Sequence, residues 1–94
     1  MISEHGITDT IKTQLFGKQV TLAPNTFTAV TVGTLNIPSG YTLLGIVGRT
    51  NGYGDQWLVS YSEYGGDVVA MCYSKYANGS LTQNLICNAI YIKG

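Results

Sequence analysis

Charged side chains are scarce in this sequence of 94 residues. Asp, Glu, Lys and Arg make up 11% of it, against about 25% in an average soluble domain. The basic residues are scattered as Lys12, Lys18, Arg49, Lys75 and Lys93, and the formal net charge is zero. No basic stripe is present to neutralise phosphates, so nucleic acid is not an expected partner. Because a soluble monomer carries more surface charge, we expect other copies of the chain to cover part of the surface.

Catalytic and metal-ligating side chains are equally few. The only histidine, His5, lies in an irregular N-terminal segment, so a catalytic triad has no base within the predicted strands. Asp55 and Glu63 flank one predicted strand and could form an acid/base pair, but their positions favour solvated strand ends. Cys72 and Cys87 lack the further ligands that a metal site requires. We therefore predict no enzymatic activity, no cofactor and no metal.

Long hydrophobic runs are also missing. No stretch approaches the roughly 20 apolar residues that a membrane span needs. The N-terminus has no charged region followed by an apolar core, as a secretory signal would. Neither membrane insertion nor export by the general secretory route is predicted.

The first 17 residues differ from the rest of the chain. Ile7, Ile11 and Leu15 are spaced i, i+4, i+8 and Asp9 could cap a helix. We predict either a short helix or a linker over residues 1–17. An initiating Met before such a segment suggests a C-terminal piece taken from a longer chain.

Residues 18–94 are typical of one all-β domain. Apolar and β-branched stretches at 19–23, 26–35, 41–50 and 56–62 are separated by turn signals, namely Pro24-Asn25, Pro38-Ser39-Gly40 and Gly65-Gly66. Alternation slips near Gly33, which predicts a bulge. Turn signals every 8 to 12 residues or so predict an antiparallel, jelly-roll-like β-sandwich of about six to eight strands.

Residues 67–93 are interpreted as a β-hairpin. Asn78-Gly79 separates two apolar runs, which is a strong hairpin signal. A tight turn would place Cys72 opposite Leu85 and Ala70 opposite Cys87, leaving the cysteines as diagonal neighbours and so as buried free thiols. Alternation then gives two apolar faces, one with Val68, Ala70, Cys72, Leu85, Cys87, Ala89 and Tyr91, the other with Val69, Met71, Tyr73, Ile86, Ile90 and Ile92. One face should cover a core, and the other a second layer or a neighbouring subunit.

Aromatic rings near loops are the best candidates for binding. Rings beside planar hydrogen-bonding groups suit sugar faces or protein loops. The alternative is that the rings fill a core or a subunit interface: strand parity favours burial of Trp57 and Tyr61 and leaves Tyr53, Tyr64 and Tyr76 open. The candidate ligand-binding residues are Arg49, Asn51, Tyr53, Asp55, Trp57, Tyr64 and Tyr76.

The order of motifs resembles the C-terminal tip domains of tailed-phage tail fibres and receptor-binding proteins, including prophage copies. The resemblance spans nearly the whole chain, through Ser3-Glu4-His5-Gly6, Phe16-Gly17-Lys18, LAPNTFTAVTV, IPSGYTLLGIVG and LICNAIYIK. Many such fibres continue after Glu-His-Gly with a Trp-Tyr-x-Arg/Lys-Trp type stretch, which Ile7 to Leu15 replaces here.

This resemblance implies a homotrimeric β-sandwich at the end of a longer fibre chain, assembled in the host cytoplasm and carried in the virion tail. Such a tip adheres to a host surface glycan or protein. The alternative is a structural virion or baseplate subunit with no ligand of its own. Because tip loops vary with the host, the resemblance assigns no binding residues to this sequence.

Overall fold

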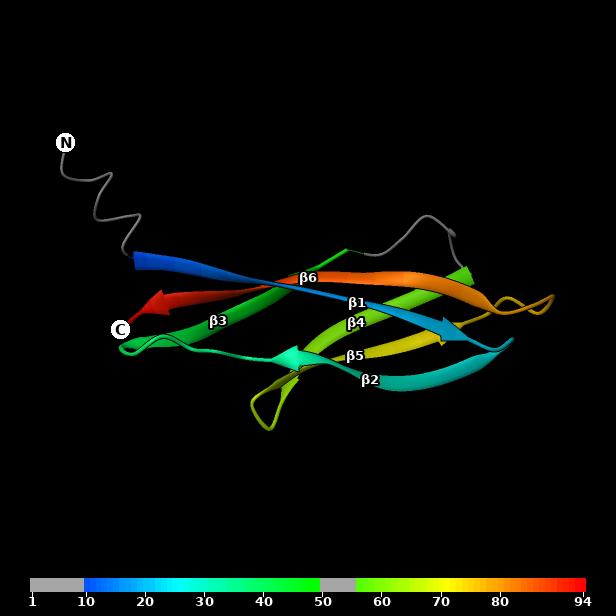
Figure 1. Cartoon of the computed structure of the whole chain (residues 1–94), viewed down its shortest axis with the longest axis horizontal. Coiled ribbons are helices and arrows are strands. Elements are labelled where there is room, and N and C mark those ends of the chain that lie inside the picture. Colours follow the sequence, from blue (N-terminus) through cyan, green and yellow to red (C-terminus); the bar gives the residue numbers. More distant parts are fainter. Residues whose placement is uncertain (1–9, 50–55) are drawn as a thin grey trace.

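A computed structural model describes residues 10–49 and 56–94, which form two three-stranded antiparallel sheets. One sheet has the order β1-β6-β3 and the other the order β2-β5-β4 (Figure 1). The strands are β1 (Ile11–Leu22), β2 (Thr26–Thr34), β3 (Tyr41–Gly48), β4 (Trp57–Tyr64), β5 (Asp67–Ser74) and β6 (Leu81–Lys93). The predicted all-β sandwich is confirmed. Nested pairing of β1 with β6 and of β2 with β5 gives it a jelly-roll-like arrangement.

The predicted hairpin between β5 and β6 is wrong. Each is the central strand of a different sheet, and the connection through Asn78-Gly79 crosses between the layers. In this arrangement β6 pairs with β1 and β3, and β5 with β2 and β4, so the backbones of both apolar strands have partners on either side. A tight hairpin joins β4 to β5 instead. Gly65 and Gly66 have φ of 61° and 86°, the left-handed values that a two-residue type I′ turn requires.

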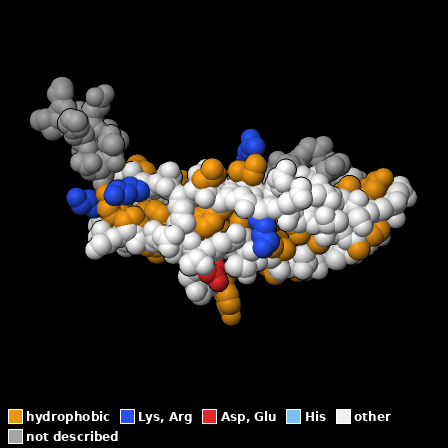
Figure 2. All heavy atoms as spheres, in the orientation of Figure 1, with side chains coloured by type: hydrophobic (Ala, Val, Ile, Leu, Met, Phe, Trp, Pro, Cys, Tyr) orange, Lys and Arg blue, Asp and Glu red, His pale blue; other side chains and the backbone are white. Residues whose placement is uncertain are grey.

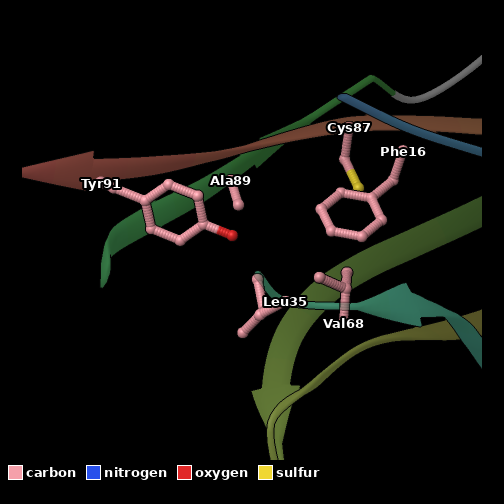
Figure 3. Packing of buried hydrophobic residues seen from close by; sticks show 6 residues of the cluster. All are labelled: Phe16, Leu35, Val68, Cys87, Ala89 and Tyr91. Carbon is pink, nitrogen blue, oxygen red and sulfur yellow. The ribbon is translucent and has the colours of Figure 1, made fainter. Parts of the chain in front are cut away.

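One of the two apolar faces of the predicted hairpin is buried in the structure, but as two rows from different sheets that face each other across the core. Its seven residues are each at most 1% exposed, namely Val68, Ala70, Cys72, Leu85, Cys87, Ala89 and Tyr91. Figure 3 shows Tyr91, Ala89 and Cys87 opposite Leu35 and Val68. Cys72 and Cys87 therefore come from opposite layers, and both are buried free thiols, as predicted.

Strand β1 begins at Ile11, so residues 11–17 are neither helix nor linker, and the predicted domain boundary at residue 17 lies inside a strand. Residues 1–9 lie outside the described part of the chain. The strand pairs with β6 along its whole length, from Ile11 opposite Ile92 to Leu22 opposite Leu81. A spacing of four residues is even, so Ile11 and Leu15 share one face of a strand as readily as one face of a helix.

Two glycines allow aromatic rings to lie close to the backbone between the layers. A Cβ atom on Gly33 would lie 2.7 Å from the Phe16 ring, and one on Gly48 would lie 2.0 Å from the Tyr61 ring. The register also shifts between Thr31 and Gly33, which confirms the predicted bulge. These contacts attach β2 to β1 and β3 to β4, at the two long edges of the sandwich.

Candidate functional site

The four predicted ligand-binding residues that the structure describes do not form one exposed site: Trp57 and Tyr76 belong to one core cluster, and only Arg49 and Tyr64 are exposed. Trp57 is 2% exposed and packs in the core, so it cannot contact a ligand from outside. Tyr76 is partly buried against the same cluster. Tyr64 is 78% exposed at the opposite end of β4, about 23 Å from Trp57 at strand rise. Arg49 is exposed just after β3. The remaining three candidates, Asn51, Tyr53 and Asp55, lie outside the described residues.

An exposed apolar row instead crosses the outer face of the β2-β5-β4 sheet. Tyr73 of β5 is paired with Phe27 on one side and with Leu58 on the other. Directly paired residues share a face, so the three side chains stand side by side. Phe27 is 58% and Leu58 51% exposed, and Met71, two residues before Tyr73, is 38% exposed. We call Phe27, Tyr73, Leu58 and Met71 the apolar row.

Hydroxyl groups surround this row. Met71 is paired with Ser60, and Val69 lies between Thr31 and Ser62 at the next level of the same face. Rings and aliphatic groups beside hydroxyls can stack on the apolar face of a sugar while the hydroxyls exchange hydrogen bonds with its rim. Sequence reasoning missed Phe27 and Leu58 as surface residues, although alternation along 26–31 and 57–62 carried the signal.

The carboxylates near this face have structural partners. Glu63 accepts a hydrogen bond from the Gly66 backbone N–H at 2.8 Å, and Asp67 accepts one from the Thr34 hydroxyl at 3.0 Å. Glu63 thus caps the β4–β5 turn. Figure 2 shows few charged side chains in view and hydrophobic ones scattered among polar atoms. Within residues 10–49 and 56–94 there is no pocket, and no group of three His, Cys, Asp or Glu side chains that could hold a metal.

The buried titratable groups are held in their neutral forms. Burial first, and then the nearby Cys87 and Cys72, raise the pKa of Tyr61 to about 12, against a backbone hydrogen bond at Ile86 that lowers it. Burial also raises the pKa of both thiols. A thiol is a nucleophile only as its thiolate. Cys72 and Cys87 are therefore inert core residues.

Comparison of the chain with protein-family models, with curated proteins and with solved structures gave no match. In the described part of the chain, no helix has the length and apolar character needed to cross a membrane.

Proposed function

We propose that this chain is the tip domain of a phage or prophage tail fibre, a receptor-binding module that adheres to a saccharide on the host cell surface. It acts as a homotrimer at the end of a longer fibre chain in the virion tail. The resemblance of its motifs to such tips supports this proposal. The fold, a small β-sandwich, is compatible with it.

The observation that carries the proposal is the apolar row on the outer face of the β2-β5-β4 sheet. An exposed Phe and Leu flanking a Tyr on a flat face offer a rigid contact surface with little side-chain entropy to lose. The neighbouring serine and threonine hydroxyls can hydrogen-bond to a bound sugar and so fix its orientation. Low affinity at one such shallow surface is offset in a trimer, because three linked sites bind with much greater avidity than one.

Binding of the labelled protein to a panel of bacterial cells, to their isolated wall polysaccharide and to a glycan array tests this proposal. We expect saturable binding to cells and to polysaccharide, and loss of at least tenfold in apparent affinity for Phe27→Ser and Leu58→Ser. Ile37→Ser is the matched control, because Ile37 is 46% exposed but lies in the connection between β2 and β3.

The outcome also separates the alternatives. Binding that survives periodate oxidation of the cells but not protease treatment would identify a protein receptor in place of a saccharide. No binding to any cell or polysaccharide by the assembled protein would refute adhesion and favour a structural virion or baseplate subunit. Equal loss in Ile37→Ser would show that the apolar row is not the contact surface.

A further inference from the structure

The outer face of the β1-β6-β3 sheet is aliphatic over the half that lies nearest the C-terminus. The register places Ile11 and Thr42 on either side of Ile92, and Leu15 and Val47 on either side of Asn88. The exposed fractions are 45% for Ile11, 69% for Leu15, 60% for Leu44 and 60% for Val47. We call this surface the aliphatic face; it comprises Ile11, Leu15, Leu44, Val47, Ile86, Ile90 and Ile92.

Charge is absent from the outward positions of all three strands of this sheet. Alternation turns the odd positions of β1 and the even positions of β6 outward, and these are Ile, Leu, Thr, Gln, Asn and Gly throughout. Lys12 lies on the opposite side of β1, where its ammonium group is 5.1 Å from the centroid of the Tyr41 ring. The face could therefore meet an identical face without like-charge repulsion.

The far half of the same face is polar and already internally bonded. The Thr21 and Thr82 hydroxyls are 2.7 Å apart, and the Gln19 amide donates to Asn84 at 3.5 Å. The aliphatic half is thus bordered on one side by polar groups, as the apolar core of a specific protein interface is bordered by its polar rim.

The dimensions fit a contact between proteins. With strands about 4.8 Å apart and a rise of about 3.3 Å per residue, three strands over the aliphatic half cover roughly 300 Å² in projection. That is the size of the larger apolar patches that mark functional surfaces. Over the twelve residues of β1, the projected area of the face is on the order of 500 Å². Side chains that stand out from the sheet add accessible surface to this area, which approaches the roughly 800 Å² per partner of a standard interface.

The chemistry of this face favours a second copy of the chain over a polar ligand. Aliphatic side chains offer neither hydrogen bonds nor flat rings, whereas the opposite face of the sandwich offers both. The inward side of β6, with Cys87 and Tyr91, is filled by the chain's own core, so on this sheet only the outward side with Ile86, Ile90 and Ile92 remains available.

We infer that the aliphatic face is the self-association surface of this protein, where it packs on the same face of other copies of the chain. For the number of copies, the inference rests on the homotrimer of the proposed function, in which the aliphatic faces of three chains meet around a common axis. In such an assembly the apolar row of every copy points outward and is free to bind a saccharide.

Molar mass by sedimentation velocity and light scattering at micromolar concentration tests the inference. We expect the unaltered chain to have three times the mass of one chain. Leu15→Lys combined with Val47→Lys should lower the molar mass to that of the monomer and raise the protein concentration at half dissociation at least tenfold. Both side chains are mostly exposed on edge strands, so the circular dichroism of the variant should keep its β signature.

Phe27→Lys is the matched control, since it puts the same charge on the opposite face; it should leave the assembly intact. As a second measurement, Asn88→Cys at the centre of the face should form disulfide-linked dimers under mild oxidation, while Ser60→Cys on the opposite face should not. Cys72 and Cys87 are buried and should not contribute.

A monomeric unaltered chain, or dissociation by Phe27→Lys but not by the double variant, would overturn the inference. A dimer that the double variant disrupts would support the face but refute the trimer. Absence of cell binding by the unaltered protein, with its assembly intact, would instead refute the proposed adhesion alone.

Discussion

Replacement of Gly48 by alanine should destabilise the protein although it adds only one methyl group. The new Cβ would lie 2.0, 2.2 and 2.9 Å from ring atoms of Tyr61, far inside van der Waals contact. The ring cannot easily move, because Tyr61 packs against both core clusters and its hydroxyl donates to the Arg49 carbonyl at 3.5 Å. Overpacking of this kind costs about 1–3 kcal/mol.

The lower entropy of the unfolded alanine chain offsets about 0.4–1 kcal/mol of this cost. We therefore expect a net loss of about 1–2 kcal/mol, which for a domain of this size lowers Tm by about 5–15 °C. Thermal unfolding by circular dichroism, at one fixed protein concentration, measures the change.

Gly45→Ala on the same strand is the control, because a Cβ there meets no atom of the described residues within 4 Å. It should be neutral or slightly stabilising. Truncation of the ring by Tyr61→Leu should remove most of the additional cost of Gly48→Ala, which a double-mutant cycle would show as coupling. If Gly48→Ala and Gly45→Ala proved equally stable, the close approach of ring and backbone would be refuted.

Three further predictions concern buried polar groups. Folding raises the pKa of Tyr61 from 10.0 to about 12, so the folded state holds the phenol proton more tightly than the unfolded state does. The resulting stabilisation is complete below about pH 10 and is lost as the pH rises through about 12. Urea unfolding across this range should show the loss of stability in the unaltered chain and a smaller loss in Tyr61→Phe. Gln14 accepts hydrogen bonds from the Tyr91 hydroxyl and the Asn36 N–H. Gln14→Leu removes the acceptor of the buried Tyr91 hydroxyl and should lower the free energy of unfolding by about 1–3 kcal/mol. Recovery of stability in the double variant with Tyr91→Phe checks this cause. The buried Ser74 hydroxyl has no hydrogen-bond partner among the described residues, so Ser74→Ala should leave the unfolding midpoint unchanged or raise it, and a clear decrease would contradict the lack of a partner.

The candidate site shows which features the local sequence pattern can predict and which it cannot. Trp57 and Tyr64 sit at the two ends of one strand, and the sequence placed both near loops. Strand parity favoured burial of Trp57 and left Tyr64 open; in the folded chain Trp57 is enclosed by residues from both sheets, while Tyr64 projects from the edge strand next to the turn. Phe27 and Leu58 are remote in sequence and became neighbours only through pairing with Tyr73.

The sequence by itself determined the all-β class, the turns at Asn25, Gly40 and Gly65-Gly66, the bulge near Gly33 and which side chains of β5 and β6 alternate onto the same side of each strand. These are local properties, set by backbone geometry at a few residues or by side-chain alternation with a period of two. Only the tertiary structure decided that β5 and β6 lie in opposite sheets and that β1 begins at Ile11. Strand pairing depends on contacts between distant segments, and the same alternation is compatible with two rows on one sheet or on two facing sheets.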